Sequence, residues 1–256
     1  MLSNNDRSLQ ILEALLKEVN GCALTQLSTD LDIPKSAMHR LLTSMKDMGY
    51  IYQDEQTQHY KLSLKIASMG LTYLSSRSIT ETFQPLLNEL AEQSAELVRL
   101  GMIEDEKIIW IAKAQGSKSG LKYDPDSGSV AYLPASACGL AYLSSIDSDG
   151  FFKIVEREGF EKAKLLGPNS PKSLEQLTAM VEASRERGYG LISDTYEIGM
   201  TAMAKTIINP YTNKPFGTVS IAGPSFRLNE QRIQELSPAL IATAEKLGEI
   251  IHLAHL

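Results

Sequence analysis

Apolar residues recur at three- and four-residue steps along the first fifty positions, which predicts three helices that each bury one face. The first helix is expected over residues 8–19, with an apolar stripe of Leu9, Leu12, Leu15, Leu16 and Val19. A short second helix begins where Thr25 can cap it. Pro34 suits the first turn of the third helix, where a missing N–H costs nothing. The buried side of that helix is expected to be Met38, Leu41, Leu42, Met45 and Met48.

The opposite side of the third helix is polar and carries Lys35, Ser36, His39, Arg40 and Thr43. Two short helices joined by a tight turn, the second exposing such a face, have the organisation of a helix-turn-helix. Two short strands around the polar residues 54–57 predict a hairpin, which would form a wing. We therefore predict a winged helix-turn-helix domain over residues 1–62.

A helical connector is expected over residues 63–78. Ser63 can cap it, and its apolar residues follow the spacing of a coiled coil: Leu64, Ala67, Leu71 and Leu74. The apolar pattern is interrupted at residues 75–78 and resumes in a new helix with Pro85 near its start. The second domain is therefore predicted over residues 79–256.

Alternating apolar positions and turn residues in the second domain predict an antiparallel sheet of about five or six strands flanked by helices. Strands are expected at 97–103, 108–114, 121–123, 130–133, 189–193, 201–208 and 216–222. Short helices are expected at 136–145 and 151–158, and longer ones from Ser173 to Gly188 and from Asn229 onward. The fold class is thus α+β.

Charge limits how such a chain can contact nucleic acid. The net charge is −6, and residues 1–62 carry more acidic than basic side chains, so bulk attraction to phosphates is excluded. Residues 34–46 hold Lys35, Arg40 and Lys46 and no acid at all. Any DNA binding is therefore expected to depend on this one short element.

Several classes of protein are disfavoured. No apolar stretch is long enough to cross a bilayer and no signal peptide opens the chain, so we expect a cytoplasmic protein without a membrane partner. Cys22 and Cys138 lie far apart without metal-ligand spacing, which predicts two buried thiols, no metal site and no cofactor. Cys138 as a redox switch is an alternative interpretation. No histidine occurs between Tyr60 and Ile251 and no catalytic set emerges, which favours binding without turnover.

Specific segments resemble the IclR family of bacterial transcription regulators. Those in the N-terminal half are similar to the family's winged helix and cover residues 8–13, 24–27, 33–42 and 49–51. Those in the C-terminal half are similar to its effector domain: Gly188-Tyr189, Gly199, residues 220–224 and Arg227-Leu228. The resemblance spans nearly the whole chain. It implies a DNA-binding regulator with a GAF-like, effector-binding and oligomerising C-terminal domain.

On matching positions, the resemblance implies that the following residues lie in or beside the major groove: Lys35, Ser36, Ala37, His39, Arg40 and Thr43. Arg40 is the candidate for a base contact, because a guanidinium can bond guanine O6 and N7 together. Lys35 and Lys46 are expected to hold phosphates. The resemblance also implies a homodimer or a dimer of dimers, with dimers formed through the DNA-binding half. A two-fold symmetric dimer would bind a double-stranded, approximately palindromic operator.

The same resemblance implies an effector pocket lined by Ala137, Cys138, Ile192, Ala202, Ser220 and Ala222, with Tyr123 and Met200 as neighbours. The N–H groups at residues 137–139 open a helix and could hold a carboxylate without any basic residue, which favours a small organic acid. Members that bind small oxo-acids place Asp, Cys and Ser where this chain has Ile192, Ala202 and Ala222. The pocket is therefore expected to be less polar, and a larger or aromatic acid fits as well as a two- or three-carbon one. Ordinary core packing is the alternative interpretation of the alanines.

Three functions follow from these patterns. The first is an allosteric regulator, repressor or activator, in which a metabolite changes how paired winged helices meet the operator. The second is an enzyme that metabolises a small acid and carries an appended winged-helix module. The third is a protein-interaction adaptor that uses the winged helix as a docking surface.

Overall fold

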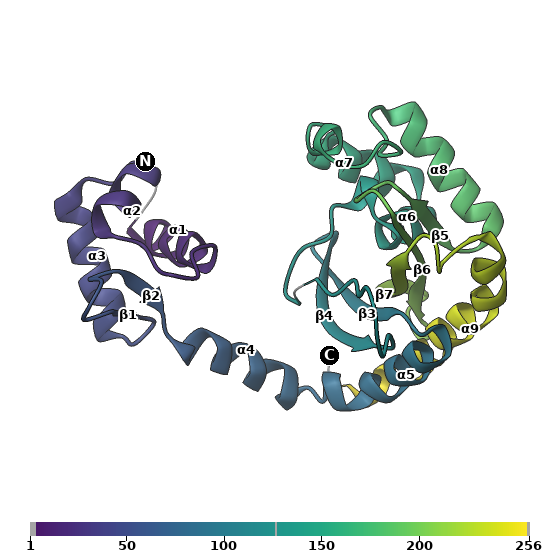
Figure 1. The fold of residues 1–256 in the computed structure, drawn as a ribbon, viewed down its shortest axis with the longest axis horizontal. Helices are drawn as coiled ribbons and strands as arrows, with labels where there is room; N and C mark the ends of the chain where they lie inside the picture. Colours follow the sequence, from purple (N-terminus) through teal and green to yellow (C-terminus); the bar gives the residue numbers. More distant parts are fainter. Residues whose placement is uncertain (1–3, 126, 255–256) are drawn as a thin grey trace. The chain divides into compact units, whose positions relative to one another are not determined.

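A computed structural model describes residues 4–125 and 127–254 (Figure 1). The chain divides into two compact units, residues 1–76 and 77–256. Each unit has its own hydrophobic core. None of the described helices is both long enough and apolar enough to span a membrane.

The N-terminal unit is a winged helix-turn-helix, as predicted. Its elements are α1 (Asn4–Leu16), α2 (Leu24–Asp30), α3 (Lys35–Asp47), β1 (Ile51–Gln53), β2 (Tyr60–Leu62) and α4 (Leu64–Ser76). The strands β1 and β2 pair antiparallel and form the wing. Met38, Leu42 and Met45 of α3 pack into the core of this unit together with Ile11, Leu27 and Ile51.

The predicted apolar stripe of the first helix was right at the buried Leu15 and the half-buried Leu12, and wrong at its other three positions. Ile11 and Leu15 are buried, whereas Leu9, Leu16 and Val19 are 61%, 73% and 94% exposed. The helix ends at Leu16, so Val19 lies beyond it. Apolar residues occur on more than one side of α1, and periodicity alone does not say which side meets α3 and β2.

The ends of α2 and α3 differ in detail from the prediction. Ala23, not Thr25, precedes α2, and the Thr25 carbonyl accepts a bond from the Thr29 hydroxyl inside the helix. Pro34 is the residue before α3 rather than part of its first turn. Met48 directly follows α3 and is exposed, so it does not belong to the buried side of the helix as predicted.

The C-terminal unit is built on a five-stranded antiparallel sheet in the order β4-β3-β7-β6-β5. The strands are β3 (Leu97–Glu104), β4 (Lys107–Gln115), β5 (Gly190–Ser193), β6 (Met200–Asn209) and β7 (Lys214–Pro224). Arg99 pairs with Ser220, and Ser220 pairs with Ala204 across the three central strands. These three side chains therefore lie on one face of the sheet.

Helices cover both faces of this sheet (Figure 1). The helices α5 (Ile79–Ser94) and α9 (Glu230–Glu249) pack on one face, and α6 (Ala137–Ser144) and α8 (Leu174–Arg187) pack on the other. α7 (Ser148–Glu158) follows α6, and short 3-10 turns occupy residues 133–135, 162–165 and 251–253. Ser173 caps α8 as predicted, because its hydroxyl accepts from the Gln176 N–H.

Two predicted strands do not form among the described residues. Residues 121–123 have no regular structure, and Val130 makes only an isolated bridge to Ile109 before a 3-10 turn begins at Leu133. Gly120 and Gly128 both have positive φ, which interrupts extended structure on either side of this loop. Pro85 lies well inside α5 rather than near its start, because the helix begins at Ile79.

Candidate functional site

The exposed side of α3 carries the residues predicted to meet DNA. Lys35, Ser36, His39, Arg40, Thr43 and Lys46 are exposed, and Ala37 is half-buried. The Thr43 hydroxyl donates to the His39 carbonyl at 2.9 Å, which holds it against the helix. Since the opposite side of α3 is fixed in the core, its basic side chains are presented on one outward face.

Acidic charge in the wing is partly neutralised within the hairpin. The Asp54 carboxylate accepts N–H groups from Gln56 and Thr57 and lies 3.1 Å from Lys61 Nζ. The Thr57 backbone hydrogen bond, followed by the bond from Lys61, lowers the pKa of Asp54 below its usual range. The carboxylate is thus held by the turn and by Lys61, which weakens its repulsion of a phosphate backbone.

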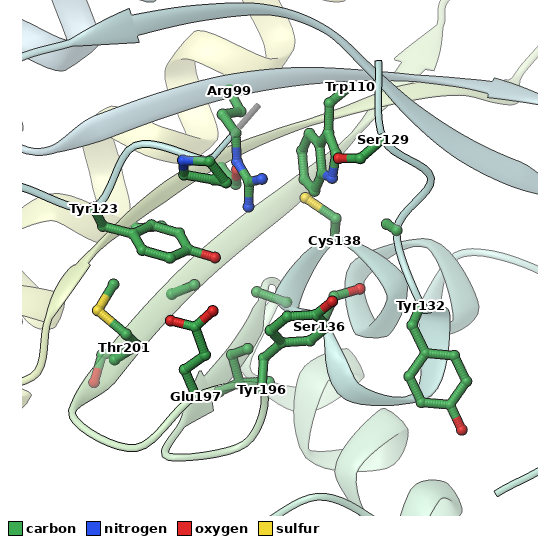
Figure 2. A pocket seen from close by; sticks show the side chains of 18 of the residues that line it. Arg99, Trp110, Tyr123, Ser129, Tyr132, Ser136, Cys138, Tyr196, Glu197 and Thr201 are labelled. Atoms are coloured by element: carbon green, nitrogen blue, oxygen red, sulfur yellow. The ribbon is translucent and has the colours of Figure 1, made fainter. Parts of the chain in front are cut away.

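A cavity of about 260 Å³ opens in the C-terminal unit beside the start of α6 (Figure 2). Its walls come from the sheet, from the N-terminal end of α6 and from loops on either side. The structure brings together all eight residues that were predicted to line an effector pocket: Tyr123, Ala137, Cys138, Ile192, Met200, Ala202, Ser220 and Ala222. Residues more than ninety positions apart thus share one cavity.

Two charged residues that sequence reasoning missed also line this cavity, Arg99 and Glu197. Arg99 thus adds a basic side chain to the helix N–H groups that were predicted to hold a carboxylate. The Arg99 Cζ atom lies 3.8 Å from the Trp110 ring centroid and 5.8 Å from that of Tyr123. A lone arginine between Val98 and Leu100, in an otherwise apolar strand, was the signal available in the sequence.

The start of α6 is only partly open to a ligand. Ser136 caps the helix, and its hydroxyl accepts the Gly139 N–H at 3.1 Å. Of the three N–H groups predicted to hold a carboxylate, the one at Gly139 is thus already bonded. The N–H groups of Ala137 and Cys138 lie in the first turn, where no carbonyl of the same helix can reach them.

Both cysteines are buried free thiols, as predicted. Burial raises the pKa of the Cys138 thiol above its usual value, and the nearby Thr218 hydroxyl and Arg99 charge only partly oppose this. The reactive species of a cysteine is the thiolate, which this environment disfavours. The structure therefore gives no support to Cys138 as a redox switch.

An ion pair between a half-buried arginine and a buried glutamate anchors the loop that carries Tyr123. Glu96 is only 3% exposed, and its Oε2 atom accepts from Arg227 Nη2 at 2.9 Å. The same guanidinium donates to the Leu121 carbonyl at 2.9 Å. Gln115 then donates to the Tyr123 carbonyl at 3.0 Å. The ion pair and the amide together hold Tyr123 at the edge of the cavity.

The cavity offers groups for binding rather than a catalytic set. Its described lining residues include no histidine. In the part of the chain that the structure describes, no three His, Cys, Asp or Glu side chains lie close enough together to hold a metal ion. A ligand would meet aromatic rings, aliphatic side chains, serine and threonine hydroxyls, one arginine and one glutamate.

Comparison with known proteins matches both units to one family. The model described as the IclR helix-turn-helix domain matches residues 6–55, and the model described as the bacterial transcriptional regulator IclR C-terminal domain matches residues 71–249. The transcriptional repressor IclR of Escherichia coli K12 is 27% identical over 94% of this chain and 87% of its own length.

Solved structures share the fold. An IclR regulator from Alicyclobacillus acidocaldarius has a TM-score of 0.81 at 19% identity, covering 97% of this chain and 98% of that one. An IclR homologue from Microbacterium hydrocarbonoxydans, solved with 4-hydroxybenzoate, has a TM-score of 0.80 at 15% identity, covering 98% and 100%.

Proposed function

Because the chain belongs to the IclR family of bacterial transcriptional regulators, we propose that α3 reads an operator and that a small organic acid in the cavity controls this binding. The observation that carries the proposal is that one chain has both an exposed basic face on α3 and a ligand-sized cavity in its second unit. The family consists of regulators with a DNA-binding helix-turn-helix and an effector-binding C-terminal domain, not of enzymes. The family assignment therefore argues against the enzyme alternative.

On the operator, Arg40 contacts a base edge while Lys35 and Lys46 hold phosphates. Replacing Arg40 with Ala is expected to cost about 1–3 kcal/mol on the preferred sequence and to relax specificity at one base pair. Replacing Lys46 with Ala should weaken all sequences alike and reduce the salt dependence by about one phosphate contact. Fluorescence titrations with operator duplexes, each changed at one base pair, measure both effects.

The exposed Lys17, which follows α1, provides a matched control as Lys17→Ala. This variant should bind every duplex as the unchanged protein does. Identical behaviour of the Arg40 and Lys46 variants across all sequences and salt concentrations would contradict the division of roles.

A two-fold assembly follows from the proposed reading of DNA. The helix α4 has no buried residue among those described, and Leu64 and Leu71 are largely exposed on it. A second copy of the chain packing on these side chains would remove their apolar surface from water. The protein is thus proposed to act in the cytoplasm as a homodimer or a dimer of dimers on an approximately palindromic operator.

An organic acid is the proposed effector because the cavity combines Arg99 with aromatic walls. The structural relative solved with 4-hydroxybenzoate supports a small carboxylic acid about as large as one aromatic ring. Ala202 is half-buried and lines the cavity, so Ala202→Phe should fill it and abolish binding. Calorimetry with a panel of aliphatic and aromatic carboxylic acids measures the loss.

The matched control for that experiment is Ala202→Ser, which adds one oxygen and leaves the cavity open. It should keep whatever acid the unchanged protein binds. Equal binding by the Phe variant would place the effector elsewhere. DNA titrations with and without the bound acid then measure the coupling between the two sites, which by linkage must be equal in both directions.

A further inference from the structure

We propose that the effector is a zwitterion, an organic acid that also carries a protonated amine, held between Arg99 and Glu197. This inference rests on the proposed function of the cavity as an effector site and names the chemical class that the site takes. The smallest common members of the class are free amino acids.

Arg99 is placed to bind the acidic group. Its guanidinium lies between the rings of Trp110 and Tyr123 and faces the cavity (Figure 2). No ion pair neutralises it among the described residues, and its Nε atom is buried without a hydrogen-bond partner. The terminal N–H groups of a guanidinium can bind both oxygens of a carboxylate through charge-assisted hydrogen bonds.

The neighbouring lysine does not compete for this role. Lys113 pairs with Arg99 across the strands, but its Nζ atom lies 2.6 Å from the Asp124 carboxylate and donates to the Pro125 carbonyl. Its charge is therefore already balanced at the cavity rim. Arg99 remains the cation that faces the ligand.

Glu197 faces the same space from the opposite side (Figure 2). It lies in the loop between β5 and β6, is exposed to solvent on its outer side, and forms no ion pair among the described residues. Tyr123 reports that both charges are near: burial raises the pKa of its phenol, Arg99 lowers it and Glu197 raises it. Figure 2 shows the Tyr123 hydroxyl between the Arg99 guanidinium and the Glu197 carboxylate.

Opposite charges on two walls select against a simple acid. A monocarboxylate satisfies Arg99 but brings a second negative charge toward Glu197, and a dicarboxylate does so more strongly. A ligand with a carboxylate at one end and an ammonium at the other satisfies both walls and leaves neither charge unpaired.

The other residues that line the cavity indicate which ligand side chain would fit. Trp110, Tyr132, Tyr196 and Ile192 line the cavity, so an apolar or aromatic side chain fits better than a charged one. A volume of about 260 Å³ is below the roughly 300–1,000 Å³ of pockets for drug-sized molecules. One ring or one branched chain is therefore the expected size.

Calorimetry on the full-length protein tests the proposal with pairs of compounds that differ only in the amine. The pairs are L-phenylalanine and 3-phenylpropanoate, L-tyrosine and 3-(4-hydroxyphenyl)propanoate, and L-leucine and 4-methylpentanoate. At least one amino acid should bind about tenfold or more tightly than its partner, the ratio expected for one added charge-assisted hydrogen bond. Equal or tighter binding by the compounds without an amine overturns the proposal, and so does binding by no member of either set.

Variants of Arg99 and Glu197 test whether the preference for compounds with an amine arises in the cavity. Glu197→Gln should abolish the preference for the amine while retaining binding of the acids, and Arg99→Gln should weaken both sets. Glu182→Gln, an exposed acid on α8, is the matched control and should change nothing. An unchanged preference in Glu197→Gln overturns the proposal, and thermal unfolding confirms that each variant is folded.

A separate arm distinguishes this inference from the proposed function. Operator titrations are repeated with the carboxylic acids and with the amino acids. If acids without an amine bind through Arg99 and change DNA affinity, the regulator assignment stands and the zwitterion is wrong. If the chain does not bind its own upstream DNA under any condition, the regulator assignment itself is wrong.

Discussion

Replacing Arg227 with Met is expected to lower the free energy of unfolding of the C-terminal unit by about 3–5 kcal/mol, the cost of leaving a buried charge without its partner. Glu96 is nearly inaccessible to water, and the Arg227 guanidinium binds its carboxylate through Nε and Nη2. Met replaces the aliphatic part of the arginine side chain but provides no positive charge and no hydrogen-bond donor. Urea unfolding followed by circular dichroism measures the loss.

Two further variants show whether the buried charge is the cause. Arg232→Met breaks an exposed pair with Glu235 on α9 and a hydrogen bond to the Gln93 carbonyl, and should lower the stability much less than Arg227→Met does. Glu96→Met combined with Arg227→Met removes both charges and should recover much of the stability. If Arg227→Met costs no more than Arg232→Met, the pair does not stabilise the fold in the way described.

Replacing Leu42 with Ala is expected to destabilise the N-terminal unit by about 2–5 kcal/mol and so to abolish DNA binding at moderate temperature. Leu42 is 0% exposed on the inner side of α3, and the unit has a small core in which few contacts can compensate. Because the two units have separate cores, ligand binding to the C-terminal unit should persist. Operator titrations and calorimetry on the same sample measure the two outcomes.

Leu16→Ala is the matched control, because Leu16 is the same residue type at the end of α1 and is 73% exposed. Its effect should stay within about 0.5 kcal/mol. Loss of DNA binding by both leucine variants alike, or by neither, would contradict the role assigned to the inner face of α3.

Helical periodicity predicted α3 well because its apolar and polar residues separate cleanly onto two sides. The same rule failed for α1, where Leu9 and Leu16 looked like core residues and are exposed. When a helix has apolar residues on several sides, its sequence does not show which side is buried. The element that packs on the helix decides this. The partners of α1 are α3 and β2, which pattern alone does not position.

The predictions of strands at 121–123 and 130–133 failed for a related reason. Short apolar runs become strands only where a neighbouring strand pairs with them over several residues. Here β4 bonds the backbone of Gly128, Ser129 and Ala131, but only Val130 forms a bridge, and the pairing does not continue into a strand. The loop instead follows the edge of the cavity, where the bonds to Leu121 and Tyr123 hold it. No local feature of the sequence indicated those bonds to Arg227 and Gln115.

The sequence by itself determined the two units, the winged helix-turn-helix and the basic side of α3, because spacing along a helix is local information. It also identified, through family resemblance, eight residues of one cavity. Only the tertiary structure decided that Arg99 and Glu197 face each other there, since antiparallel pairing brings β3 beside β7 and the β5–β6 loop turns back over the same face. The charge that a ligand meets depends on contacts between residues far apart in the chain, which no local pattern contains.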